Sequence, residues 1–176
     1  MLRFAVSHRL PLVLATTGQT EEELQMIHEA ASEVPLFFAA NFSIGVALLI
    51  ECAKKVASAL PDAEIEIVEM HHDRKMDAPS GTAIAIANAL RDVRPELTAV
   101  SGRTGFGKRT PNEIGIHSVR IGNLPGIHEV IIGTGTQTLT LKHEAHDRAL
   151  FAEGALTAAA FLRGKPAGLY DMKSLF

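Results

Sequence analysis

The chain has 176 residues, of which 47% are hydrophobic and 21% charged, and its formal net charge is −3. This composition is ordinary for one large or two small globular domains, and it excludes a disordered tail, a collagen-like repeat and a coiled-coil rod. The single cysteine excludes an internal disulfide, and no basic stretch indicates nucleic-acid binding. No apolar run reaches the ~18 residues of a membrane span, and the first residues lack a signal-peptide pattern, so we expect a cytoplasmic protein.

The N-terminal part of the chain alternates strands and helices. Its short apolar runs are typical of buried parallel strands. Thr20 stands three residues before Glu23, which is a capping box, and Ser43 is placed to cap a second helix that ends before Pro61. The predicted elements are a strand over 10–15, a helix over 21–32, a strand over 34–39 and a helix over 43–60. This order indicates a doubly wound α/β sheet.

The pattern changes near residue 63. Residues 64–69 (EIEIVE) alternate charged and apolar residues at first, as a strand with one face in water does. The other predicted elements are a polar loop over 71–81, a helix over 82–91, a loop over 102–111, strands over 114–121, 127–134 and 137–143, and a helix over 148–162 that Asp147 caps. We therefore expect a mostly antiparallel or mixed sheet with helices on one face.

The densest chemistry lies in residues 69–83 (EMHHDRKMDAPSGTA). The candidate site residues there are His71, His72, Lys75, Ser80, Gly81 and Thr82. The first backbone N–H groups of a helix have no internal partner, so the predicted helix start can bind an anion. The two hydroxyls add donors, and the glycine lets a ligand approach the backbone closely. The alternative is a polar surface loop with an ordinary helix cap.

Metal binding and phosphate binding are both disfavoured by spacing. Adjacent residues on a strand point to opposite faces, so His71 and His72 rarely share a metal ion. The HEAH sequence at 143–146 has the wrong spacing for a zinc protease, and His128 has no second histidine in register. Residues 102–109 approach a P-loop, but an arginine stands where Ser or Thr is needed, and no G-x-G-x-x-G occurs. We expect no metal site and a mobile loop.

Five segments together resemble the family of 4-hydroxy-tetrahydrodipicolinate reductase (dihydrodipicolinate reductase) of the lysine and diaminopimelate pathway. They are 16–18 (TTG), 40–46 (ANFSIGV), 69–83, 115–120 (GIHSVR) and 168–172 (GLYDM). The HHxxKxDAPSGTA string is long and specific, and the resemblance extends from about residue 10 to residue 176. It implies reduction of a cyclic imine with two carboxylates by NADH or NADPH, in a homotetramer.

The resemblance also implies an α/β fold of two domains. Residues 1–41 and 147–176 would be the remainder of a Rossmann-like dinucleotide-binding domain, and residues 42–146 a mixed-sheet domain for substrate binding and oligomerisation. It implies His71 as catalytic histidine, Lys75 as proton donor, and substrate contacts from His72, Ser80, Gly81, Thr82 and, from the other domain, Arg148. The implied cofactor contacts are Ala15, Thr16, Thr17, Ala39, Ala40, Asn41 and Phe42, with Ala15 in place of a family glycine.

The chain begins after the family's first strand, Gly-rich turn and helix, which hold the pyrophosphate. Two hypotheses follow: a reductase that still holds its cofactor, or a truncated, non-catalytic relative that binds a dicarboxylate or assembles without turnover. The residue that selects NADH or NADPH would lie in the missing part, so that preference stays open. A metal hydrolase is a third, disfavoured interpretation.

Overall fold

The computed structural model describes all 176 residues and divides them into two compact units. The first contains Met1–Ile44 and Ala149–Phe176, and the second contains Gly45–Arg148. These boundaries lie within three residues of those expected from the sequence, but Arg148 falls in the second unit and not in the first. None of the helices combines the length and apolarity needed to cross a membrane.

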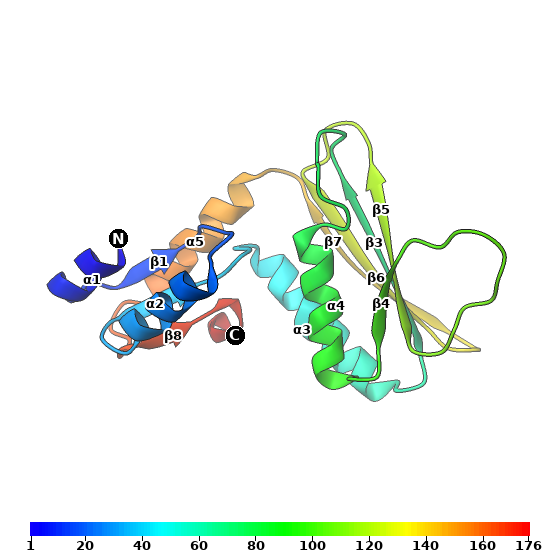
Figure 1. The fold of residues 1–176 in the computed structure, drawn as a ribbon, viewed down its shortest axis with the longest axis horizontal. Coiled ribbons are helices and arrows are strands. Elements are labelled where there is room, and N and C mark those ends of the chain that lie inside the picture. Colours follow the sequence, from blue (N-terminus) through cyan, green and yellow to red (C-terminus); the bar gives the residue numbers. More distant parts are fainter. The chain divides into compact units, whose positions relative to one another are not determined.

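The first unit is a three-stranded parallel sheet in the order β1-β2-β8. Its elements are β1 (Leu12–Leu14), β2 (Pro35–Phe38), β8 (Gly168–Tyr170), α1 (Leu2–His8), α2 (Glu21–Ala31), α5 (Ala149–Phe161) and the short 3-10 helix η1 (Met172–Leu175). Leu36 packs with Ile27 of α2, whereas the next residue, Phe37, meets Phe161 of α5 edge to face at 6.2 Å. Because successive strand residues face opposite sides, helices cover both faces, and the predicted doubly wound sheet is confirmed (Figure 1).

The capping box at α2 is present as predicted. The Thr20 hydroxyl accepts the backbone N–H of Glu23 at 3.2 Å, and the Glu23 carboxylate accepts the backbone N–H of Thr20 at 2.9 Å. Three acidic residues in the first turn also complement the positive end of the helix dipole. The start of α2 is therefore fixed by local sequence alone.

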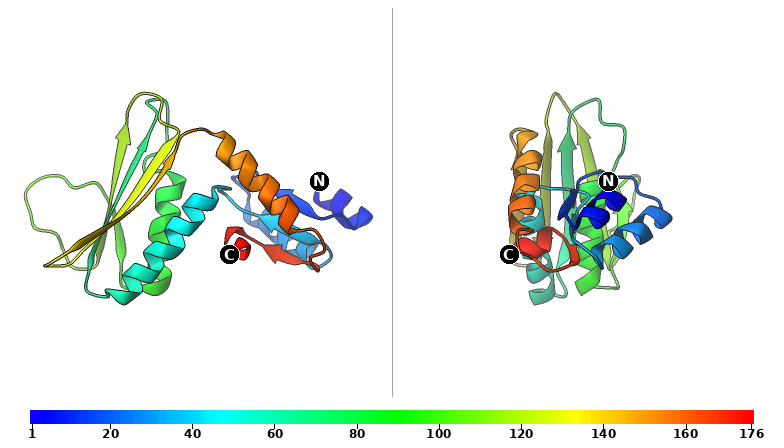
Figure 2. Two further views of the ribbon diagram at one scale, coloured as in Figure 1. Left: turned by 180° about the vertical axis from the view of Figure 1, so that it is seen from behind. Right: turned by 90° about the vertical axis from the view of Figure 1, so that its left-hand side faces the viewer.

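The second unit is a five-stranded mixed sheet in the order β4-β5-β3-β6-β7. Its elements are β3 (Glu64–His71), α4 (Gly81–Val93), β4 (Thr98–Ser101), β5 (Glu113–Arg120), β6 (Gly126–Gly133), β7 (Thr138–Ala145) and α3 (Ile44–Ala59), which starts at the end of the first unit. The pairs β3–β5 and β4–β5 are parallel, and β3–β6 and β6–β7 are antiparallel. The predicted mixed sheet with helices on one face is confirmed (Figure 2).

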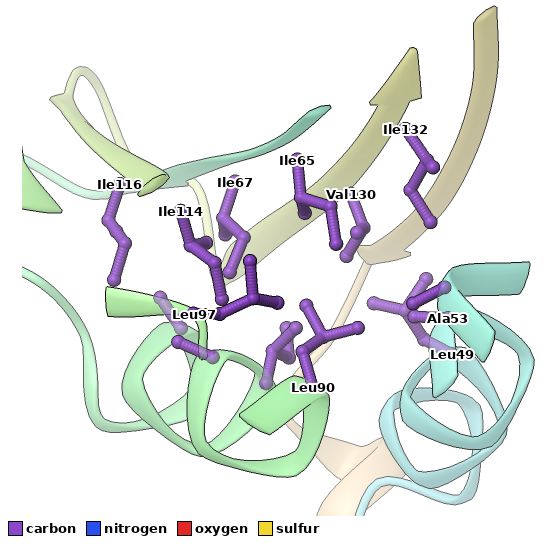
Figure 3. Close-up of a cluster of buried hydrophobic side chains, with 14 of the residues drawn as sticks. Leu49, Ala53, Ile65, Ile67, Leu90, Leu97, Ile114, Ile116, Val130 and Ile132 are labelled. Atoms are coloured by element: carbon purple, nitrogen blue, oxygen red, sulfur yellow. The ribbon is translucent and has the colours of Figure 1, made fainter. Parts of the chain in front are cut away.

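The core of the second unit lies between this sheet and the helices α3 and α4. Figure 3 shows Leu90 of α4 and Leu49 of α3 directed at the isoleucines of the sheet, among them Ile65 and Ile67 of β3. The inward positions of β3 are 65, 67, 69 and 71, by its burial pattern. The first two are apolar and belong to the core, and the last two are the polar residues Glu69 and His71.

The sequence did not predict four short elements: α1, β4, β8 and η1. The helix α1 has seven residues and no side-chain cap, and β8 has three residues. The loop that follows β4 leads into β5, which pairs with β4 in parallel, so no helix stands where a P-loop needs one. Arg109 of this loop is instead paired with Glu66 of β3.

A glycine in α5 controls the approach of the loop after β2. A Cβ atom on Gly154 would lie 1.8 Å from the carbonyl oxygen of Phe42. Alanine normally stabilises a helix interior relative to glycine, but here the clash reverses the sign, and we expect Gly154→Ala to lower the free energy of unfolding by about 1–3 kcal/mol. Urea unfolding measures it. Gly135→Ala, where a Cβ meets nothing within 4 Å, is the control; equal stability of the two variants would contradict the prediction.

Candidate functional site

The site in the second unit is built around the carboxylate of Glu69, which has 0% of its surface exposed. One oxygen accepts from Nδ1 of His71 at 2.5 Å and from Nη1 of Arg120 at 2.9 Å. The other accepts from Nη2 of Arg120 at 2.8 Å and from the backbone N–H of Ser80 at 3.1 Å. Burial alone raises the pKa of Glu69, but the hydrogen bonds, that of Arg120 foremost, outweigh it and lower the pKa to about 2. Glu69 is therefore ionised at neutral pH.

The start of α4 adds hydrogen-bond donors beside this carboxylate. The Ser80 hydroxyl caps the helix by accepting the N–H of Ala83 at 3.2 Å, and it lies 3.2 Å from Nε2 of His128. Gly81 is exposed, and a Cβ atom on it would meet nothing within 4 Å. Thr82 follows in the first turn. The backbone N–H of Gly81 contacts the carboxylate of Asp77 and helps to lower its pKa, so this helix start already holds an anionic group, as helix N-termini favour.

Two buried histidines stand next to each other at the site. The rings of His71 on β3 and His128 on β6 meet edge to face at 5.2 Å. Burial lowers the pKa of His71, although Glu69 acts in the opposite direction. Burial, with His71 as the next cause, lowers the pKa of His128 to about 4. The pairing of β6 with β7 places His143 opposite His128, a neighbour that motif spacing along the sequence does not show.

Lys75 lies on the loop after β3, which is tied to the site by several bonds. Its Nζ is 2.7 Å from Oδ1 of Asp77, and this hydrogen bond lowers the pKa of Asp77. The carbonyl of Asp77 also accepts from Arg120 at 2.6 Å, and the N–H of His72 donates to the carbonyl of Leu124 at 2.9 Å. The position of Lys75 therefore depends on the same arginine that holds Glu69.

His72 and Arg148 line one cavity of about 380 Å³, together with Arg74, Asn123, Pro125, His146 and Asp147. The prediction that Arg148 reaches the site from the other domain is wrong, because Arg148 belongs to the same compact unit as His72. Arg148 also directly precedes α5 and so lies outside its first turn. Arg74 and Arg148 line this cavity together with one acid, Asp147, and Arg74 is itself paired with Asp73.

The residues predicted to contact a cofactor are divided between two cavities of the first unit. Ala15, Ala40, Asn41 and Phe42 line a cavity of about 420 Å³ with three residues of α5, Phe151, Ala152 and Ala155. Thr16 and Thr17 line another of about 590 Å³ with residues of α1 and α2. Ala39 is half-buried and lines neither. The first cavity lies just after the carboxyl ends of β1 and β2, where parallel α/β sheets bind ligands.

The sequence patterns do not predict the roles of Glu69, Arg120 and His128 in the site. For Glu69 one pattern indicates burial: the residues two and four positions earlier on the strand, Ile67 and Ile65, are core residues. A carboxylate on the buried side of a strand needs a cationic partner. The identity of that partner depends on the pairing of β3 with β5, which places Arg120 opposite His71.

The doubly wound unit with its cavity and the mixed-sheet unit with its buried acid and imidazole define an α/β enzyme of two domains. Family models described as "Dihydrodipicolinate reductase, C-terminus" and "Dihydrodipicolinate reductase, N-terminus" match residues 45–176 and 1–42. The chain belongs to the dihydrodipicolinate reductase family, whose curated members named 4-hydroxy-tetrahydrodipicolinate reductase are NAD(P)H-dependent oxidoreductases.

Individual relatives agree over nearly the whole chain. The 4-hydroxy-tetrahydrodipicolinate reductase of Clostridium tetani is 44% identical, over 98% of this chain and 68% of its own length. That of Caldanaerobacter subterraneus subsp. tengcongensis is 47% identical, over 99% and 70%. The solved structure "Dipicolinate bound Dihydrodipicolinate reductase from Paenisporosarcina sp. TG-14" matches with a TM-score of 0.80 and 30% identity, over 97% of this chain and 66% of that one. The chain spans about two thirds of these relatives.

The low pKa of His128 predicts acid sensitivity of the second unit. In the unfolded chain this histidine has a pKa near 6.5, and in the folded protein near 4. As the pH falls, the unfolded state therefore binds the proton first. The contribution of neutral His128 to the free energy of unfolding is complete above about pH 6.5 and is lost as the pH falls to about 4. The total loss is about 3 kcal/mol.

The test is the free energy of unfolding by urea between pH 7 and 4. We expect His128→Gln to make the free energy of unfolding depend less steeply on pH between pH 7 and 4. His146→Gln, which removes an exposed histidine of the same unit, is the control and should keep it. The stability contribution of ionised Glu69 is lost in a separate pH range, from its ordinary pKa of 4.5 down to about 2. Identical slopes for His128→Gln and the parent chain would contradict the prediction.

Proposed function

We propose that this chain catalyses the NAD(P)H-dependent reduction of 4-hydroxy-tetrahydrodipicolinate to tetrahydrodipicolinate, in lysine and diaminopimelate biosynthesis in the cytoplasm. The observation that carries the proposal is the buried pair of Glu69 and His71 beside the solvent-exposed helix N-terminus at Gly81. An imidazole next to a helix start combines a proton carrier with an anion site, and reduction of an anionic imine needs both.

The charges of the second unit suit a cyclic dicarboxylate, the class of ligand named for the solved relative. Removing a carboxylate from water costs several kcal/mol after relaxation, so each needs compensation. We propose that the helix start at Ser80, Gly81 and Thr82 binds one carboxylate in place of the Asp77 side chain, which otherwise contacts the Gly81 N–H. The cations Lys75 and Arg148 supply charge-assisted bonds, which contribute ~1.5–3 kcal/mol each. His72, in the same cavity as Arg148, is a further substrate contact.

Proton delivery falls to the residues of β3 and its loop. A bound nicotinamide supplies a hydride to the ring, and a proton must then reach the neighbouring carbon. His71 and Lys75 are the proton carriers that this part of the chain offers. The bond of Lys75 to Asp77 holds its ammonium group at one place on the loop. The bond of His71 to Glu69 holds the imidazole.

The cavity of about 420 Å³ in the first unit is where we propose that the nicotinamide half of NADH or NADPH binds. Ala15 and Ala40, which follow β1 and β2, give it small-sided walls, and Phe42 and Phe151 add aromatic ones, so a flat ring can lie within it. Gly154 lets the backbone at Phe42 approach α5 and so shapes this cavity.

We further propose that the protein is a homotetramer formed through the outer face of the five-stranded sheet. Helices cover only the other face of this sheet. The outer face carries apolar side chains on three strands, including Val68, Val119 and Ile131, and Val119 is 37% exposed. Light scattering should give four chain masses, and a monomeric mass would contradict the proposal.

The catalytic roles predict large losses of turnover on conservative replacement. We expect His71→Asn or Lys75→Met to lower kcat by about 10²–10⁴-fold, because each removes a proton carrier from the reacting centre. Nicotinamide absorbance with fresh substrate measures this. His28→Asn, an exposed histidine of the first unit, is the control. Unchanged turnover of both site variants would contradict the assigned roles.

Cofactor binding separates the reductase from the second candidate, a non-catalytic relative that binds a dicarboxylate or assembles without turnover. We expect calorimetric titration to show binding of NADH or NADPH, and Ala15→Val to weaken it by closing the cavity. Binding of dipicolinate without binding of either nucleotide would select the second candidate.

A further inference from the structure

We infer that Glu69 is a positioning residue for His71: its carboxylate keeps the imidazole proton on Nδ1, so that Nε2 is the nitrogen that exchanges a proton with the substrate. The inference rests on the proposed function for the identity of the substrate. Its first part, which concerns the tautomer, rests on the geometry of the chain alone.

The donor and acceptor roles at Glu69 leave one arrangement. An ionised carboxylate is only an acceptor, with about four lone-pair directions. The carboxylate accepts from the two nitrogens of Arg120, from the N–H of Ser80 and from the side chain of Ser118. Nδ1 of His71, at 2.5 Å, contacts the same acceptor-only group, so it must be a donor and must carry a hydrogen. Neutral His71 is then the Nδ1–H tautomer, with a lone pair on Nε2.

The surroundings of Nε2 agree with this role. A Cβ atom on Gly126 would lie only 3.1 Å from Nε2, so the glycine keeps this edge of the ring uncovered by a side chain. His71 itself is 8% exposed, which leaves the ring little freedom to turn. Glu69 and Gly126 thus approach the ring from its two nitrogen sides.

Charged and titratable groups face His71 from several elements, and they act in opposite directions. Glu69, on the same strand, favours the imidazolium. Arg120 of β5 and Lys75 of the loop after β3 disfavour it, and His128 of β6 presents a neutral ring at 5.2 Å. Among these groups only Glu69 is a negative charge in contact with the ring. Removing its charge must therefore lower the proton affinity of His71.

The chain offers a matched control on the same strand. Glu66 lies on the outer face of β3, 2.9 Å from Nε2 of His117, and it is also paired with Arg103 at 3.2 Å. It thus repeats the acid, imidazole and guanidinium combination away from the site. Glu66→Gln removes the same charge from the same strand without touching His71.

The experiment is long-range ¹H–¹⁵N NMR of the full chain labelled with ¹⁵N-histidine, with the His71 signals identified by their loss in His71→Asn. We expect the parent chain to show the Nδ1–H tautomer at high pH. In Glu69→Gln we expect the pKa of His71 to fall by about one unit, because a contacting opposite charge is lost. Glu66→Gln should leave His71 unchanged. An Nε2–H tautomer in the parent chain, or an unshifted His71 in Glu69→Gln, would overturn the inference.

Two further readouts keep the test decisive. If circular dichroism shows that Glu69→Gln does not fold, the tautomer of the parent chain decides alone. For turnover, we expect Glu69→Gln to lower kcat by about 10–100-fold with little change in KM and to move the alkaline limb of the pH profile to lower pH, because His71 donates its proton as the imidazolium. A shifted His71 pKa with unaltered turnover in both Glu69→Gln and His71→Asn would support the positioning of the ring and overturn the proposed function.

Discussion

The buried carboxylate of Glu69 is the constraint on which the second unit depends. A charge taken out of water at this depth is tolerated only if its lone pairs are filled by well-placed donors. Those donors come from three separate elements: Arg120 at the end of β5, Ser80 at the start of α4, and His71 two residues further along β3. One anionic group therefore fixes the carboxyl ends of two strands and the amino end of a helix relative to one another.

The burial that makes this arrangement rigid also determines which groups meet an anionic ligand. It lowers the pKa of His71, His128 and His143, so imidazoles on the inner face are biased toward their neutral form. Arg120 is occupied by Glu69 and by the carbonyl of Asp77. The charges that we propose for a dicarboxylate are therefore those at the rim, on the loop lysine and on the arginine that precedes α5.

Much of the fold could be predicted from the sequence because its signals are local. The capping box at Thr20 and the apolar runs of β1 and β2 each act within a few residues. What could not be predicted depends on pairing between distant segments. His128 meets His143 only through the register of β6 and β7. Arg148 belongs to the second unit because of packing that no local pattern encodes. Short elements such as β8 lack enough residues for a periodic signal.

For the site, the family resemblance predicts which residues take part, and the structure shows which of them are in contact. The string at 69–83 singled out His71, Lys75 and the helix start. It said nothing of which side chain holds which, because Arg120 is 51 positions from Glu69 in the chain. The contacts among these residues are a property of the folded sheet.

The alternation of β3 has a consequence for assembly of the sheet itself. β3 lies between β5 and β6 and turns Glu69 inward and Val68 outward. A slip of one residue would exchange the two faces, carrying the carboxylate away and leaving the guanidinium of Arg120 against hydrocarbon. Breaking such a pair costs about 3–5 kcal/mol, a large share of the stability of a small domain. The residues that we propose to serve the reaction thus also penalise misfolded alignments, and we expect variation at Glu69 to compromise folding fidelity together with chemistry.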